Sequence, residues 1–180
     1  GKNIKGKTII VSGSGNVAQY ATEKCIQLGG KVLTLSDSSG YISDPDGINP
    51  EKLAFVMDLK NVKRGRISAY VNQYPKASFH PGKTPWEVPC QVALPCATQN
   101  ELDGKDAAIL LKNGCVCIGE GANMPCTPEA ITQFKENKIL FAPGKASNAG
   151  GVAVSGLEMA QNSLRYSWTR EEVDSRLQSI

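Results

Sequence analysis

Short runs of apolar, often β-branched residues alternate along the chain with longer segments whose apolar residues recur every three or four positions. The short runs are typical of buried β-strands, and the longer segments of amphipathic helices. Because parallel strands need a crossover, usually a helix, this alternation predicts an α/β fold with a doubly wound, mostly parallel sheet. Six segments are strand candidates: 8–12, 31–36, a run near 77, 91–95, 115–119 and 139–143.

Boundary signals in the first third of the chain place two helices. The first begins near Asn16 and ends before the glycine pair that follows Leu28. A loop rich in Gly, Pro and Asp follows the second strand and extends through Gly47. The next helix starts with Asn49 as N-cap and a proline in its first turn.

Three more helices are expected in the second half of the chain. Two cover 103–112 and 128–138, and the last begins with a capping box formed by Thr169 and Glu172. The apolar stripe of that last helix reaches residue 180 without a C-cap signal. We therefore interpret the sequence as a fragment that ends inside a helix.

Composition narrows the class of protein. A chain of 180 residues with 41% hydrophobic and 21% charged residues is typical of one soluble domain. No apolar run approaches a membrane span, and the polar first residues are no signal peptide, so we expect no membrane partner. The net charge is only +3, and basic and acidic side chains are mixed along most of the chain, which argues against nucleic acid as a partner. The six cysteines form no C-x-x-C pair and there is one histidine, so we expect no metal site. We expect the thiols to be reduced and the location to be cytoplasmic.

The stretch VSGSGNVA, residues 11–18, combines a strand, a Gly-x-Gly turn and the start of a helix. Gly13 permits a tight turn, Gly15 lets the backbone approach a pyrophosphate, and Ala18 allows close helix–sheet packing. The helix N-terminus offers free N–H groups to phosphates. We interpret this turn as a dinucleotide site. A ligand-free βα turn and a methyl-donor-binding fold are the alternatives.

Two features of the sequence disagree about which dinucleotide binds. Asp37, just past the second strand, lies where a carboxylate that binds a free ribose 2′-hydroxyl is expected, as in NAD. Ser38 and its serine neighbours supply hydroxyl groups, and a basic run with Lys60 and Lys63 could fold back onto a 2′-phosphate. A solvated helix end is the alternative interpretation of that run.

Three later motifs are more specific: LPCATQNEL at 94–102, GEGANMP at 119–125 and APGKASNAGGVAVSGLEMAQNS at 142–163. Together they strongly resemble the cofactor-binding domain of hexameric glutamate dehydrogenases, and the resemblance covers almost the entire chain. VSGSGNVAQYA and SDSSG are similar to the NADP-dependent members. The resemblance implies that residues 1–180 form a Rossmann-type dinucleotide-binding domain whose substrate-binding, catalytic N-terminal domain is absent.

The resemblance also implies site residues. For the cofactor these are Gly13, Ser14, Gly15, Asn16, Val17, Asp37, Ser38, Lys60, Lys63, Ala97, Thr98, Gln99, Gly121, Ala122, Asn123 and Asn148. For the substrate they are Asn148, which would lie near the nicotinamide, Val152, which would line the pocket, and Ser155, which would hydrogen-bond the side-chain carboxylate. Structural roles in caps and loops are the alternative for each polar residue.

The implied reaction is reversible oxidative deamination of L-glutamate to 2-oxoglutarate and ammonia, with hydride transfer to NADP and NAD as the less favoured cofactor. The family's catalytic lysines and aspartate belong to the preceding domain, so we expect no catalytic residue here and an inactive fragment of a homo-hexameric enzyme. Lys145 is a loop lysine and a poor substitute. The alternatives are an NAD-dependent dehydrogenase of an apolar amino acid and a dinucleotide-binding module without catalysis.

Overall fold

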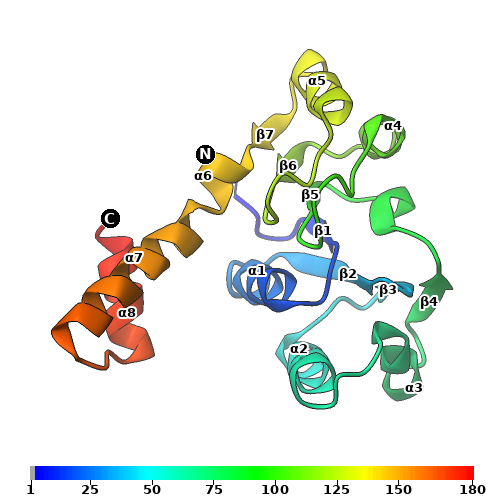
Figure 1. The fold of residues 1–180 in the computed structure, drawn as a ribbon. Helices are drawn as coiled ribbons and strands as arrows, with labels where there is room; N and C mark the ends of the chain where they lie inside the picture. The colour runs from blue at the N-terminus through cyan, green and yellow to red at the C-terminus, as the bar shows by residue number, and fades with distance from the viewer. Residues whose placement is uncertain (1–2) are drawn as a thin grey trace.

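The computed structural model describes residues 3–180 and contains one seven-stranded sheet of order β4-β3-β2-β1-β5-β6-β7 (Figure 1). The strands are β1 (Thr8–Val11), β2 (Lys31–Asp37), β3 (Gly40–Ser43), β4 (Ser78–Pro81), β5 (Val92–Leu94), β6 (Cys117–Gly119) and β7 (Leu140–Ala142). Strands β2, β1, β5, β6 and β7 are mutually parallel, and β3 pairs antiparallel with both of its neighbours, β2 and β4. The α/β fold with a mostly parallel sheet is therefore confirmed.

The sequence interpretation was wrong at β3, which it placed inside a long loop. This strand forms a hairpin with β2, in which Asp37 pairs with Gly40 across a two-residue turn. Only Tyr41 and Ile42 are apolar in this strand, so it shows no apolar run in the sequence, and the turn contains serines in place of the Asn-Gly or Asp-Gly that usually marks a hairpin. The buried side chains of Tyr41 and Ile42 keep the strand in the sheet.

The regular α-helices are α1 (Asn16–Gln27), α2 (Pro50–Met57), α3 (Tyr70–Gln73), α4 (Gly104–Lys112), α5 (Pro128–Glu136), α6 (Gly144–Ser147), α7 (Ala149–Leu164) and α8 (Arg170–Gln178). A π-helix, η1 (Asp58–Val62), continues α2, and two 3₁₀ turns occur at η2 (Ile67–Ala69) and η3 (Pro85–Glu87). The predicted caps are confirmed: the Asn49 side chain accepts a hydrogen bond from the Lys52 N–H, and Thr169 and Glu172 form a capping box. No helix among residues 3–180 is long and apolar enough to cross a membrane.

Two hydrophobic clusters occupy opposite faces of the sheet. Ile9 and Val11 of β1 face the cluster formed with α1 and α2, whereas Ile10 faces the cluster formed with α4 and α5. This alternation follows from the two-residue period of a strand. A central strand apolar on both faces is what a sheet covered by helices on both sides requires.

Helices α7 and α8 extend away from the sheet, at the left of Figure 1. Neither helix contains a buried residue, and the side chains of Val152 and Met159 are 74% and 73% exposed. Close packing in this chain therefore ends near α6, and α7 projects from the carboxyl edge of the sheet.

Candidate functional site

The carboxyl ends of β2, β1, β5 and β6 lie side by side because these strands are parallel neighbours. The chain leaves β1 toward α1 on one face, and it leaves β5 and β6 toward α4 and α5 on the other. Ligands of open α/β sheets bind in the crevice at such a reversal of strand order. The segments predicted from sequence, 13–17, 37–38, 97–99 and 121–123, all lie at this edge.

The turn between β1 and α1 is held on both sides by neighbouring strands. The Gly13 N–H donates to Ser36 Oγ at 2.7 Å, and the Ser36 N–H donates to the Gly13 carbonyl at 2.9 Å. Gly13 has φ +82°, and a Cβ built there would lie 2.9 Å from the Cys96 carbonyl oxygen. Both the backbone conformation and the approach of the β5 loop therefore require glycine at this position.

Gly15 is different, because nothing in the described protein requires it to be glycine. Its φ of −80° suits any L-residue, and no atom of residues 3–180 lies within 4 Å of a Cβ built there. It is the N-cap of α1, where no side chain caps the helix and the first turn contains no acidic residue. The free N–H groups of α1 therefore open onto space next to a residue without a side chain, which is the arrangement that binds a phosphate.

Asp37, at the end of β2, uses its carboxylate within the protein. Oδ1 accepts from the N–H and hydroxyl of Ser39, while Oδ2 accepts from Lys60 Nζ at 3.0 Å and the Ile67 N–H at 2.8 Å. Burial raises the pKa of Asp37, but the hydrogen bonds from Ser39, Ile67 and Lys60 outweigh it and lower the pKa to about 2. A carboxylate offers about four acceptor sites. The protein therefore occupies all four acceptor sites. Asp37, which favoured NAD in the sequence analysis, and Lys60, which favoured NADP, are bonded to each other.

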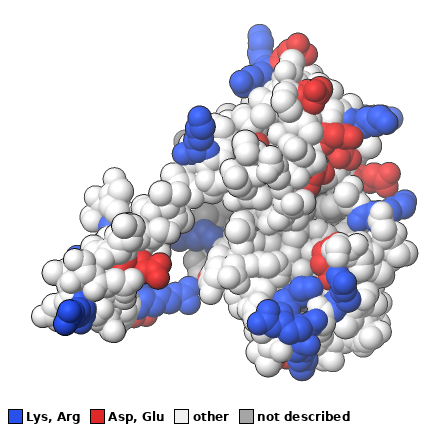
Figure 2. Space-filling model, in the orientation of Figure 1, with Lys and Arg blue, Asp and Glu red and all other residues white. Residues whose placement is uncertain are grey.

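The basic segment 60–66 lies beside the end of β2. Figure 2 shows Lys and Arg side chains gathered at the lower right, over the region of α2 and α3. Lys63 is exposed and pairs with Asp58 at 2.6 Å. Arg66, which the sequence interpretation did not select, donates to Ser38 Oγ at 2.6 Å. Its position in the same basic run was the available signal, and the structure shows that Arg66 and not Lys63 contacts the predicted serine.

The loops after β5 and β6 pack against each other. The Gly121 and Ala122 N–H groups both donate to the Pro95 carbonyl at 3.0 Å, and a Cβ at Gly121 would lie 2.5 Å from Cys96 Sγ. Burial raises the pKa of the Cys96 thiol, with help from nearby Glu101 and Cys25, to about 12. Cys96 is thus a packing residue of the crevice and has no activated thiolate.

Glu101 organises the other side of the β5 loop. Its Oε1 accepts from the Ala97 N–H at 2.8 Å and the Thr98 N–H at 3.2 Å. Burial raises the pKa of this carboxyl, although hydrogen bonds from Ser12 and from those two N–H groups oppose the shift. The backbone donors of Ala97 and Thr98 are therefore occupied, whereas the side chains of Thr98 and Gln99 are exposed at the crevice.

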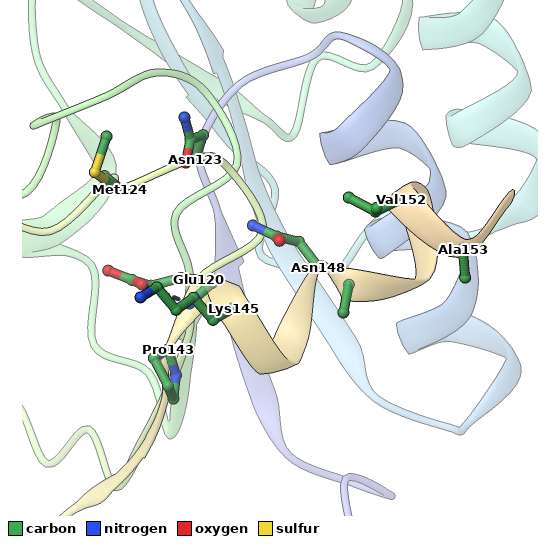
Figure 3. Close-up of a pocket in the computed structure, with 10 residues that line it drawn as sticks. Glu120, Asn123, Met124, Pro143, Lys145, Asn148, Val152 and Ala153 are labelled. Carbon is green, nitrogen blue, oxygen red and sulfur yellow. Dashed lines mark hydrogen bonds between the residues drawn. The ribbon is translucent and has the colours of Figure 1, made fainter. Parts of the chain in front are cut away.

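A cavity of about 740 Å³ lies between the loop after β6 and the α6–α7 segment. Its lining is Glu120, Asn123, Met124, Pro143, Gly144, Lys145, Asn148, Ala149, Val152 and Ala153 (Figure 3). The Asn148 amide points back toward the loop that carries Asn123 and donates to the Ala122 carbonyl at 3.1 Å. Buried Glu120 accepts from the Gly144 N–H at 2.7 Å and so ties the two walls together.

The structure therefore brings three predicted residues, Asn123, Asn148 and Val152, to one cavity. Ser155 does not belong to that lining. It is exposed on α7, and its hydroxyl donates to the Gly151 carbonyl of its own helix at 3.2 Å. Lys145 does line the cavity.

Comparison with known proteins gives this geometry a context. The family model described as Glutamate/Leucine/Phenylalanine/Valine dehydrogenase matches residues 1–180. The chain is 60% identical over 180 residues to a glutamate dehydrogenase of Bacteroides thetaiotaomicron and 58% identical to an NADP-specific glutamate dehydrogenase of Haemophilus influenzae, and it covers 40% of each. A crystal structure of Plasmodium falciparum glutamate dehydrogenase matches 98% of this chain and 38% of its own, with a TM-score of 0.94 and 53% identity. Other relatives are named NAD-specific or NAD(P)-specific.

Proposed function

Because the chain belongs to the glutamate/leucine/phenylalanine/valine dehydrogenase family, we propose that it is the dinucleotide-binding part of a glutamate dehydrogenase that prefers NADP. The chain spans about 40% of the length of the curated relatives it matches, and the longer protein would interconvert L-glutamate with 2-oxoglutarate and ammonia. A homo-hexamer stays a prediction from the resemblance, and a cytoplasmic location stays a prediction from the cysteine pattern.

The observation that carries the dinucleotide proposal is the open start of α1 at Gly15. The position needs no glycine for its own backbone, and the helix N-terminus beside it lacks both a capping side chain and an acidic first turn. An anion gains from the free N–H groups and from the helix dipole there. A ligand-free turn explains Gly13 but leaves Gly15 without a reason.

The bound dinucleotide would supply the hydride acceptor or donor, and the described residues would place it. The N–H groups of residues 15–17 would bind the pyrophosphate. Asn123 and Asn148 have amides that both donate and accept, so they suit a ribose hydroxyl and a carboxamide at the cavity. Holding the nicotinamide against the amino acid is the contribution to catalysis expected from this wall of the cleft.

The preference for NADP is supported by the state of Asp37. A carboxylate that already accepts four protein hydrogen bonds has no acceptor site left for a ribose 2′-hydroxyl. Next to it, the Ser38 hydroxyl and the Arg66 guanidinium form a pair of donors suited to a phosphate. Asp37 acts, in this proposal, by holding Lys60 and the Ile67 backbone in place.

Calorimetric titration of the 180-residue chain with NADPH and, separately, with NADH at low salt tests the proposal. NADPH should bind more tightly, and Arg66→Ala should weaken NADPH about tenfold while leaving NADH nearly unchanged, because a charge-assisted hydrogen bond is lost. Lys135→Ala, an exposed charge in the last turn of α5 on the other face of the sheet, controls for net charge. Preference of the unaltered chain for NADH would refute the NADP assignment, and binding of neither would refute the dinucleotide site.

The chain alone should not catalyse. A spectrophotometric assay with L-glutamate and NADP should show no formation of NADPH by the 180-residue chain, because the family's lysines and aspartate belong to another domain. Turnover by this chain alone would mean that residues such as Lys145 supply the missing chemistry.

A further inference from the structure

A polar network inside the fold connects the turn at Gly15 to the basic segment 60–66. Gln19 of α1 is 1% exposed, and its Nε2 donates to the Ser14 carbonyl at 2.8 Å and to Asn61 Oδ1 at 3.1 Å. Asn61 Nδ2 donates back to Gln19 Oε1 at 3.0 Å. The two amides thus form a reciprocal pair, and Gln19 also holds the backbone of the glycine turn.

Asn61 lies in the π-helix η1, whose consecutive residues Lys60 and Asn61 contact different structural elements. The Lys63 N–H donates to the Asp58 carbonyl at 3.0 Å, which is the i to i+5 bond of a π-turn. Lys60 reaches Asp37 at the end of β2, while its neighbour Asn61 reaches Gln19 on α1. The basic segment is therefore attached to both structural elements that would border the adenosine end of a dinucleotide.

We propose that the Gln19–Asn61 amide pair is a positioning device that holds the basic segment 60–66 in register with the pyrophosphate-binding turn, and that the choice of NADPH over NADH depends on it. This inference rests on the proposed function. The pyrophosphate and the 2′-phosphate of one ligand lie at a limited range of separations, so two anion sites bind it best when they are preorganised. Loss of the pair detaches the basic segment from α1 and leaves it held only on the side of β2, where Lys60 bonds Asp37. Helix α1 itself stays anchored on the sheet by buried Ala18 and Cys25.

Asn61→Ala tests this, because Asn61 is exposed and its truncation creates no cavity in the core. By calorimetry on the 180-residue chain, the Kd for NADPH should rise about five- to tenfold, as expected for hydrogen bonds that order a binding segment, while the Kd for NADH changes less than about twofold. Val62→Ala is the matched control, since Val62 is the next residue of η1 and is 72% exposed. It should leave both affinities unchanged.

Amide hydrogen exchange without cofactor gives a second readout. In Asn61→Ala, exchange in residues 58–66 should accelerate, whereas exchange in β1 and the core-facing part of α1 should not. Equal losses of NADPH and NADH affinity would overturn the proposal, because the pair would then serve only the turn. An unchanged preference with unchanged exchange would also overturn it. If the unaltered chain binds neither dinucleotide, the proposed function fails first and this inference fails with it.

Discussion

Substitution by alanine should have different effects at the two glycines of the β1–α1 turn: it should reduce stability at Gly13 and dinucleotide affinity at Gly15. In Gly13→Ala, the new Cβ sits on a backbone with φ +82° and lies 2.9 Å from the Cys96 carbonyl oxygen and 3.0 Å from Ala97 Cα. The left-handed conformation costs a non-glycine residue about 1–2 kcal/mol, and relief of the contact adds about 1–2 kcal/mol. Gly13→Ala should therefore reduce the free energy of unfolding by about 2–4 kcal/mol.

In Gly15→Ala, φ is −80° and no atom of the described chain lies within 4 Å of the added methyl group. A weaker N-cap and a less flexible unfolded chain nearly cancel, so stability should change by less than about 1 kcal/mol. The methyl group would instead occupy the space in which a pyrophosphate approaches α1. NADPH and NADH should both bind at least about tenfold more weakly, because one steric conflict costs more than 1.4 kcal/mol.

Chemical denaturation gives the stabilities, and calorimetry gives the affinities, of both variants and the unaltered chain. For a domain of this size, a loss of 2–4 kcal/mol corresponds to a fall of the melting temperature by about 4–16 °C. The reasoning is refuted if Gly15→Ala destabilises the fold as much as Gly13→Ala does. It is also refuted if Gly15→Ala folds normally and binds both dinucleotides with unchanged affinity, because Gly15 would then have no ligand to accommodate.

Three further predictions concern single side chains. The pKa of Asp37 is about 2 in the fold against an ordinary 3.8, so its carboxylate stabilises the fold above about pH 4 and loses that effect as the pH falls toward 2. The difference in unfolding free energy between the unaltered chain and Asp37→Asn should therefore shrink by about 1–2 kcal/mol from pH 4 to pH 2. A constant difference would contradict the hydrogen bonds to Asp37. Thr22 is fully buried, and its Oγ1 has no hydrogen-bond partner among the described residues. Thr22→Val should therefore raise the melting temperature by about 2–4 °C. A lower melting temperature would show that the hydroxyl does have a hydrogen-bond partner. Cys96 is 4% exposed with a pKa of about 12, so native protein at pH 8 should resist iodoacetamide there until it unfolds; mass spectrometry that finds rapid alkylation of folded Cys96 would disprove its burial.

Local signals in the sequence were sufficient for most of the architecture. Strand and helix periods, the caps at Asn49 and Thr169, and the glycine turn at 13–15 are each determined by residues within a few positions of one another. The parallel order follows because helices between strands leave few other arrangements. Strand β3 was not predicted because its four residues include only two apolar side chains, Tyr41 and Ile42, inside a polar loop, and because one of its partners, β4, is distant in sequence.

The use of each polar group at the site could only be decided by tertiary contacts. In the sequence, Asp37 favoured NAD and the basic run favoured NADP, but the sequence does not show how far apart these groups lie in the fold. Folding brings Lys60, 23 positions away, and the Ile67 N–H, 30 positions away, onto the same carboxylate, and it aims Arg66 at Ser38. By itself, the sequence determined which segments reach the carboxyl edge of the sheet, because chain connectivity sets that. Whether a carboxylate there is free for a ribose or occupied by the protein depends on donors that are remote in sequence, and only the tertiary structure decides it.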